Sequence, residues 1–422
     1  MHVLVIGAGL MGVSTAYFLQ QRNLDVTVVE SSSGPGEQTS FANAGLLTPS
    51  LADPWNAPGI GRMLIKSIGR EDAPMLLRLR AVPSLIGWGI RFLRSSDDES
   101  FLDNFRKNVV LAKYNLDVLH ELQAKTGLKF DHSARGTLRI FRDVDALRYA
   151  SHTAARHREL LDLDFLQLDR DRLLEVEPAL ALTAAKLAGA IHYPMDECGD
   201  ARRYCEELVA IAASEGVRFR FCTKIRALSR RSKRIVAAIT DDGAALEADV
   251  FVLAAGSHSA RLAKPLGVRL PVRPAKGYSI TVPMGHGPTC PTVPVIDDRL
   301  HAAVVPLGAK LRVGGTAEFA GFDLSIKPSR IENLVRLLHA VYPNLVKQDD
   351  SIDLKPWAGL RPMSVDGVPI LGETSVSNLV LNSGHGHLGW SMAAASGKVV
   401  ADLVTGRQPE IPLRDYELRR FE

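Results

Sequence analysis

Residues 3–30 of this 422-residue chain read VLVIGAGLMGVSTAYFLQQRNLDVTVVE, and this stretch decides the fold. The apolar run at 3–6 is short enough to form a buried parallel strand. Three glycines at GxGxxG spacing follow it, a helix is expected over roughly 11–21, and a second apolar run at 26–29 ends in Glu30. This order of strand, glycine-rich turn, helix and strand predicts a βαβ unit within an α/β fold.

The three glycines have separate steric roles in such a unit. Gly7 allows a tight turn at the strand end, Gly9 leaves room for a pyrophosphate beside the backbone, and Gly12 lets helix and strand pack closely. The free amides and the dipole of the helix start favour phosphate, and Glu30, eighteen residues after Gly12, can accept hydrogen bonds from a ribose. We therefore predict a bound dinucleotide, either NAD or FAD. The alternative is a βαβ unit in which the glycines serve packing alone.

The composition is that of an ordinary globular protein with room for two domains, with 46% hydrophobic and 23% charged residues. A net charge of +4 is too small to indicate a nucleic-acid partner. The four cysteines, at positions 198, 205, 222 and 290, form no CxxC pair, which favours a reducing compartment. No apolar run reaches the roughly 18 residues of a spanning helix, and the first strand begins too close to Met1 for a signal peptide. We expect a cytoplasmic protein, or one peripheral to the inner face of the cell membrane.

A second nucleotide-facing strand is expected at Val250–Gly256, where an apolar run again ends in a glycine. Two such strand ends, about 250 residues apart, predict one sheet assembled from distant segments. Further strands are expected near 136–141, 189–193, 217–221 and 379–381, with a hairpin region at 225–248 that turns at 241–243. Helices are expected over 104–125, 143–162, 200–215, 328–341 and 391–405.

Two further segments are rich in small residues. Residues 39–45, TSFANAG, allow the close approach of a flat, bulky group, although an ordinary loop explains them equally well. Residues 384–389, GHGHLG, open directly into a helix whose amides and dipole can stabilise the negative charge of a reduced flavin. A phosphate or carboxylate site, or a plain loop–helix junction, is the alternative for this second segment.

Residues 59–96 carry seven arginines and lysines against only Glu71 and Asp72, interleaved with apolar side chains that include Trp88 and Phe92. Basic amphipathic helices of this kind can lie on anionic membrane surfaces. Packing helices with solvated charged faces are the alternative.

One arginine near a strand end is a candidate substrate ligand. Arg361 lies between Leu360 and Pro362, and a guanidinium grips a carboxylate with two prongs. Tyr278 can donate a hydrogen bond to the same carboxylate. No GxxxxGK[ST], HExxH or cysteine–histidine spacing is present, and His385 and His387 have no neighbouring carboxylate or cysteine in the sequence, so no metal site is predicted.

Taken together, these segments resemble the small, FAD-bearing subunit of bacterial D-amino acid dehydrogenases, within the D-amino acid oxidase/glycine oxidase-like FAD superfamily. The likeness runs nearly from end to end. The segments that carry it are Gly7–Gly12 with Glu30, TSFANAGLLTP at 39–49, PWNAPG at 54–59, DECGD at 196–200, KGYS at 276–279, GLRPMSVDG at 359–367 and NSGHGHLGW at 382–390.

The resemblance implies a Rossmann-like FAD-binding domain of the D-amino acid oxidase type, formed by 1–50, 197–270 and 355–422. An interleaved α+β substrate domain with a mixed sheet is expected over 51–196 and 271–354. It also implies non-covalent FAD, hydride transfer from the α-carbon of a D-amino acid to the flavin, release of a 2-oxo acid and ammonia, and electron transfer to a quinone-type acceptor. A hydroxyproline or proline dehydrogenase, an oxidase that uses oxygen, and a flavin-binding subunit without turnover are the alternatives.

The motifs and the resemblance together assign the site. The carboxylate-binding arginine of the family falls on Arg361, and its substrate-side tyrosine on Tyr278. The residues expected at the cofactor are Gly7, Ala8, Gly9, Leu10, Met11, Gly12, Glu30, Ser31, Ser40, Asn43, Ala44, Gly45, Leu46, Ile225, Ala254, Ala255, Gly256, Gly359, Gly384, His385, Gly386, His387, Leu388 and Gly389. Two positions depart from the family. His387 stands where relatives usually carry a small hydroxyl residue, and residues 43–46 lack the histidine of arginine-preferring relatives.

Overall fold

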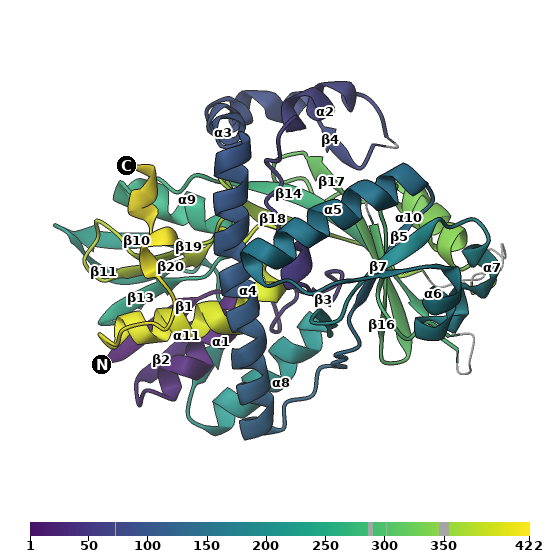
Figure 1. Ribbon diagram of the computed structural model, residues 1–422. Coiled ribbons are helices and arrows are strands. Elements are labelled where there is room, and N and C mark those ends of the chain that lie inside the picture. Colours follow the sequence, from purple (N-terminus) through teal and green to yellow (C-terminus); the bar gives the residue numbers. More distant parts are fainter. Residues whose placement is uncertain (72, 286–289, 301, 346–353) are drawn as a thin grey trace.

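The computed structural model describes residues 1–71, 73–285, 290–300, 302–345 and 354–422. Its architecture rests on two large sheets that lie side by side, one near the two chain termini and one remote from them (Figure 1). Helices cover the outer faces of both sheets, and the long helix α4 (Asp98–Thr126) crosses the junction between them.

The first sheet has six strands and contains the βαβ unit. Its order is β19 (Ile370–Glu373), β20 (Leu379–Ser383), β13 (Val250–Leu253), β1 (His2–Ile6), β2 (Asp25–Val29) and β9 (Arg218–Arg220). All neighbours are parallel except the edge pair of β19 and β20. Leu4 pairs with Phe251, so the two predicted nucleotide-facing strands lie next to each other. The prediction of one sheet built from distant segments is confirmed.

Successive residues of β1 face opposite sides of this sheet, and each side has its own core. Val3 and Val5 pack with the helices α1 (Leu10–Gln20), α4, α8 (Ala201–Ser214) and α11 (Ala393–Val404). Leu4 and Ile6 pack toward the three-stranded sheet of β10 (Ile225–Arg231), β11 (Arg234–Thr240) and β12 (Ala245–Leu246), and toward α9 (Ser259–Ala263). The apolar run at 3–6 is therefore buried on both faces, as expected for a central parallel strand.

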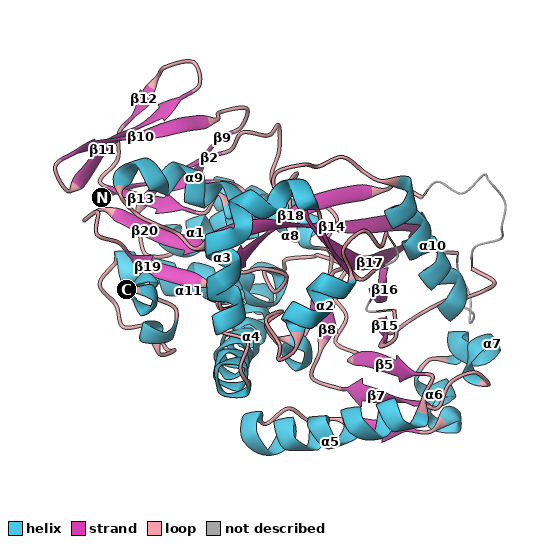
Figure 2. Cartoon of the chain, turned by 90° about the horizontal axis from the view of Figure 1, so that it is seen from above, coloured by secondary structure: helices cyan, strands magenta, loops and turns pink. Residues whose placement is uncertain are grey.

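The second sheet has nine strands of mixed direction (Figure 2). Its order is β18 (Trp357–Ser364), β14 (Val272–Pro283), β17 (Lys310–Phe319), β16 (Ala302–Leu307), β15 (Val295–Asp297), β5 (Thr137–Phe141), β7 (Gly189–Tyr193) and β6 (Leu166–Leu168), with β4 (Met75–Leu77) paired to β17. The helices around it are α2 (Ile60–Lys66), α3 (Val82–Arg94), α5 (Val144–Leu161), α6 (Arg170–Val176), α7 (Ala181–Ala184) and α10 (Pro328–Val341). A separate short ladder joins β3 (Leu46–Leu47) to β8 (Glu197–Cys198).

Two expectations about chain organisation need correction. Strand β18 falls inside 355–422, which we assigned to the first domain, but it pairs along its whole length with β14 and so belongs to the second sheet. The turn at 241–243 joins β11 to the short β12, while the main hairpin of β10 and β11 turns at Ser232, which has a positive φ of 55°.

In the segment 59–96, the side chains exposed to solvent are not the ones that we expected to contact a membrane. Trp88 and Phe92 are buried, stacked on each other and packed against Phe319, so they cannot contact a membrane. Apolar side chains are nevertheless exposed along α2 and α3. They are Met63, Ile65, Ile86, Ile90 and Leu93, together with Ile68 just after α2.

Candidate functional site

A cavity of about 1240 Å³ lies where the edges of the two large sheets meet. It exceeds the roughly 300–1,000 Å³ of a typical small-ligand pocket and is long enough to be lined by both sheets. Of the 26 residues predicted for the site, all but Ala8, Gly12 and Gly384 line this cavity. The structure thus brings together segments that are as far apart in the sequence as Gly7 and Gly389.

The end of the cavity near β1 and β2 has the geometry expected for a ribose and a phosphate. Glu30 follows β2, and its carboxylate accepts hydrogen bonds from the backbone amides of Ala8 and Ser32, both at 2.8 Å. The same carboxylate accepts the Ser31 hydroxyl at 2.9 Å. These bonds hold an acidic group at the cavity wall directly beside the glycine-rich turn, which explains why Ala8 matters without lining the cavity.

The glycine-rich turn leaves no space for side chains on its inner side. A Cβ on Gly12 would lie 1.8 Å from the carbonyl oxygen of Gly7. Gly7 itself has a positive φ of 109°, and a Cβ there would lie 2.6 Å from the carbonyl oxygen of Ala254. Gly12 and Gly7 therefore hold α1 against β1 and β13, while a Cβ on Gly9 would meet only the Ser40 hydroxyl at 3.4 Å.

The segment 42–46 forms a fixed wall between the two sheets. The Ser279 hydroxyl donates to the carbonyl of Ala42 at 2.6 Å, and the Arg312 guanidinium donates to that of Asn43 at 2.7 Å. From the other side the Gly199 amide donates to the carbonyl of Gly45 at 2.8 Å. A stretch that reads as an ordinary loop in the sequence is thus held at three of its five positions.

Arg361 lies in β18. Among the described arginines that line the cavity, it is the one whose pKa is strongly lowered by burial. Burial lowers the pKa of Arg361 to about 10, so the side chain stays cationic at neutral pH. Its Nη1 donates to the carbonyl of Thr316 at 3.3 Å, and its Cζ lies 5.2 Å from the ring of Trp55. Among the described residues no carboxylate lies within ion-pair distance of this guanidinium. A half-buried cation that lines a cavity and has no counter-charge is a candidate site for an anion.

The space for this guanidinium depends on a glycine of the neighbouring strand. A Cβ on Gly277 would lie 2.4 Å from the Cζ atom of Arg361. The β14–β17 pairing also shifts register between Gly277 and Tyr278, and the carbonyl bonded by Arg361 belongs to Thr316, which has a positive φ of 55°. An irregularity in the sheet therefore positions the arginine.

Tyr278 does not have the role predicted for it. Residue 278 borders the cavity, but it is only 1% exposed, and its hydroxyl donates to the buried carboxylate of Glu318 at 2.7 Å and cannot donate the same proton to a substrate. Burial disfavours the charged form of Glu318, but hydrogen bonds from Arg78 and Tyr278 outweigh it and lower the pKa of that carboxyl. Glu318 thus remains an acceptor, and Tyr278 forms part of the cavity wall.

Trp55 is one of several cavity residues that sequence reasoning missed. Its ring stacks on His387, with centroids 5.0 Å apart, and also lies next to the guanidinium of Arg361. Burial, helped by the charge of Arg361, lowers the pKa of His387 to about 3, so this imidazole is neutral at physiological pH. Trp55 belongs to the PWNAPG segment at 54–59, which is part of the family resemblance. That resemblance was the available sign that Trp55 lies at the site.

Comparison with known proteins places this site in a family context. The model of the DAO family, described as FAD-dependent oxidoreductases, matches residues 2–403. A D-amino acid dehydrogenase of Methylobacterium radiotolerans is 40% identical over 421 residues and covers 100% of both chains. One of Paramagnetospirillum magneticum is 41% identical over 425 residues, which is 100% of this chain and 99% of the relative. The crystal structure of glycine oxidase from Geobacillus kaustophilus superposes with a TM-score of 0.76 at 22% identity, covering 99% of this chain and 97% of that one.

Proposed function

Because this chain belongs to the DAO family of FAD-dependent oxidoreductases, we propose that it is a D-amino acid dehydrogenase that passes electrons to a quinone-type acceptor. The amino acid would lose two electrons and two protons to give an imino acid, which water hydrolyses to a 2-oxo acid and ammonia. FAD, when bound, supplies the acceptor for the hydride from the α-carbon. The observation that carries the proposal is the half-buried cation of Arg361, which lines the cavity and has no carboxylate partner among the described residues.

The lining of the cavity supports non-covalent FAD as the cofactor. Glu30 would hold the adenosine ribose, the turn at 7–11 the pyrophosphate, and the segments 42–46 and 384–389 the flavin ring. The amides of Gly386 and Leu388 already donate to backbone carbonyls, so the remaining amides of 384–389 would be the ones to stabilise negative charge on the ring. Trp55 would lie beside the substrate, and Arg361 would bind its carboxylate.

The direct test is an anaerobic screen of purified, FAD-loaded protein against D- and L-amino acids and the hydroxyproline isomers. Loss of visible flavin absorbance with D-amino acids is the expected result. Bleaching by proline or hydroxyproline alone would favour an imino-acid dehydrogenase, and no bleaching by any compound would leave only a flavin-binding subunit. Reoxidation by a soluble quinone analogue but not by oxygen distinguishes a dehydrogenase from an oxidase.

Glu30→Ala should weaken FAD binding. The ribose hydroxyls would lose a charged acceptor, at a cost of about 1.5–3 kcal/mol, which corresponds to a tenfold to hundredfold rise in the FAD dissociation constant. Glu30→Gln is the matched control, because its amide oxygen still accepts from one of the Ala8 and Ser32 amides and it should lose less. An unchanged dissociation constant in Glu30→Ala would place the ribose elsewhere.

The exposed face of α2 and α3 supports a peripheral contact with an anionic membrane. At the membrane the protein could pass electrons to a quinone. Ile65 is 72% exposed and Ile86 58%, and the basic side chains of Arg62, Lys66 and Arg94 are exposed on the same helices. Apolar side chains that enter the interface and cations that contact anionic headgroups reinforce each other. Trp55 packs in the same cluster as α2 and α3, so this face lies close to the cavity. In the described part of the chain, no helix combines the length and apolarity needed to cross a bilayer.

This contact predicts that the protein sediments with anionic vesicles at low salt but not with neutral ones. Each basic side chain near the surface contributes about 1 kcal/mol under these conditions. Ile86→Ser combined with Ile90→Ser should reduce the bound fraction, while Leu160→Ser, at an equally exposed position on α5, should not. Equal binding of both variants, or none by the wild type, would exclude this surface.

A further inference from the structure

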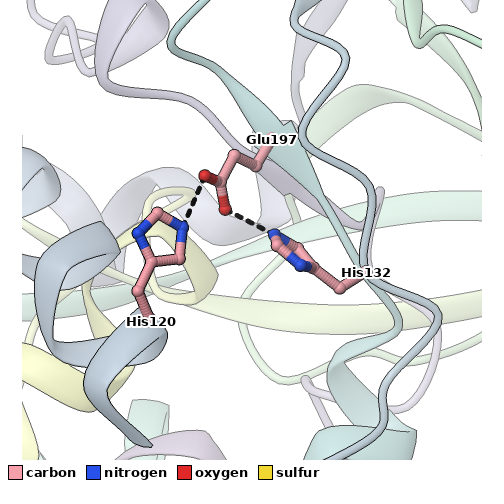
Figure 3. Close-up of side chains that lie close together, drawn as sticks. All are labelled: His120, His132 and Glu197. Carbon is pink, nitrogen blue, oxygen red and sulfur yellow. Dashed lines mark hydrogen bonds and ion pairs between the residues drawn. The ribbon is translucent and has the colours of Figure 1, made fainter. Parts of the chain in front are cut away.

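Three side chains with metal-binding atoms converge outside the cavity (Figure 3). His120 comes from the last turns of α4, His132 from the loop that follows, and Glu197 from β8. The Nε2 atoms of the two histidines lie 2.7 and 2.6 Å from separate oxygens of the Glu197 carboxylate. Twelve residues separate the histidines and 65 more separate His132 from Glu197, so sequence spacing does not predict this cluster.

We propose that His120, His132 and Glu197 bind a divalent transition metal of the Zn²⁺ class. Two imidazole nitrogens and one carboxylate oxygen form a ligand set that such metals accept, with the fourth position left to water. Mg²⁺ and Ca²⁺ prefer oxygen ligands and should bind poorly. The proposal is independent of the amino acid substrate, because none of the three residues lines the cavity.

The geometry requires only a small adjustment. Ligands about 2.1 Å from a tetrahedral metal lie about 3.4 Å from one another, and the ligand atoms here all lie within 4.8 Å of one another. Entry of the metal would replace the two hydrogen bonds to Glu197 and move its oxygens slightly away from the imidazoles. The His120 side chain is 51% exposed, which leaves it free to rotate and opens a path from solvent.

The other two ligands are held in place. The Glu197 side chain is only 6% exposed, and its strand pairs with β3 at Leu47. The ring of His132 packs against Phe130, and the neighbouring Ser133 exchanges two backbone hydrogen bonds of 2.9 Å with Cys198. Two fixed ligands and one adaptable ligand are a suitable arrangement for a metal that arrives after folding.

A metal at this point would tie together α4, the loop 127–136 and β8. Strand β8 supports β3, and Leu46 of β3 lines the cavity. We therefore expect the metal to stabilise the fold in this region rather than to take part in the chemistry at Arg361.

The experiment uses FAD-loaded protein without a polyhistidine tag, freed of metal with a chelator and titrated with Zn²⁺ by calorimetry. One Zn²⁺ per chain and a higher Tm in its presence are expected. Loss of a group that only hydrogen-bonds a metal ligand typically costs about ten- to a hundredfold in metal affinity. Loss of a ligand itself, in His120→Ala or His132→Ala, should therefore cost at least about tenfold. Mg²⁺ should give neither the binding heat nor the Tm shift.

Two variants keep the test decisive. His120→Gln retains a hydrogen-bond donor for Glu197 but is a poor ligand, so it should fold normally and still lose Zn²⁺. His152→Ala removes an exposed histidine of α5 outside the cluster and should bind as the wild type does. Wild-type affinity in His120→Gln and His132→Ala, or no uptake of Zn²⁺ by the wild-type protein, would overturn the proposal.

Discussion

Arg361→Ala should lower kcat/KM for the best amino acid substrate by about 30- to 1,000-fold, while the FAD content stays that of the wild type. The substrate must bring its carboxylate out of water, which is costly unless a cation receives it. Truncating one partner of a buried charged pair typically costs about 2–4 kcal/mol. Both kcat and KM should suffer, because a carboxylate that is not gripped leaves the α-carbon misplaced as well as weakly bound.

The matched variants separate charge from geometry. Arg361→Lys keeps a cation but not the two-pronged grip, so it should recover only part of the loss. Gly277→Ala should lower kcat/KM as Arg361→Ala does, although it leaves the arginine in place. The new methyl group would occupy the space of the guanidinium and displace it. Arg269→Ala removes an exposed arginine outside the cavity and should leave kcat/KM unchanged. If Arg361→Ala changed kcat/KM by less than about threefold with flavin intact, the carboxylate would bind elsewhere.

Gly12→Ala should abolish stable FAD binding and destabilise the fold. The added methyl carbon would lie 1.8 Å from the carbonyl oxygen of Gly7, and neither backbone can yield without separating α1 from β1. Overpacking of this kind typically costs about 1–3 kcal/mol and more where backbone must move. The measurements are the ratio of flavin to protein after gel filtration and the Tm.

A second glycine provides the control for Gly12→Ala. Gly87 lies on the exposed side of α3, and a Cβ there would meet no atom within 4 Å among the described residues. Gly87→Ala should therefore keep its flavin and gain about 0.5–1 kcal/mol of stability from better helix propensity. Full flavin content and an unchanged Tm in Gly12→Ala would mean that the turn adapts more readily than its close contacts indicate.

Sequence reasoning succeeded where structure depends on local pattern. Helix α10 begins at Pro328 and ends at Val341, as predicted, because its apolar periodicity and the proline at its start are both local signals. The pairing of β1 with β13 was also predictable, since both runs end in a glycine where the chain leaves the sheet. Most of the residues predicted for the site line one cavity, because they lie in segments at the strand ends that meet there; their roles remain predictions.

Sequence reasoning failed for features that depend on contacts between residues far apart in the chain. The residues of β18 contain no sign that they pair with β14, and the hydroxyl of Tyr278 is engaged by a carboxylate 40 residues away. Helix α3 is apolar on both sides, so its sequence does not show that Trp88 turns inward and Ile86 outward. These choices depend on neighbours that only the folded chain provides.

The parallel pairing of β1 with β13 has a consequence for biosynthesis. Val3 acquires its neighbour Val250 only after that residue has been made, about 12–50 s later at roughly 5–20 residues per second. Throughout that interval the glycine-rich turn has a strand on one side only, and the cavity wall at 384–389 does not yet exist. FAD bound as proposed would therefore find a complete site only when nearly the whole chain has left the ribosome, which would make cofactor loading a step of late maturation rather than an early guide to folding.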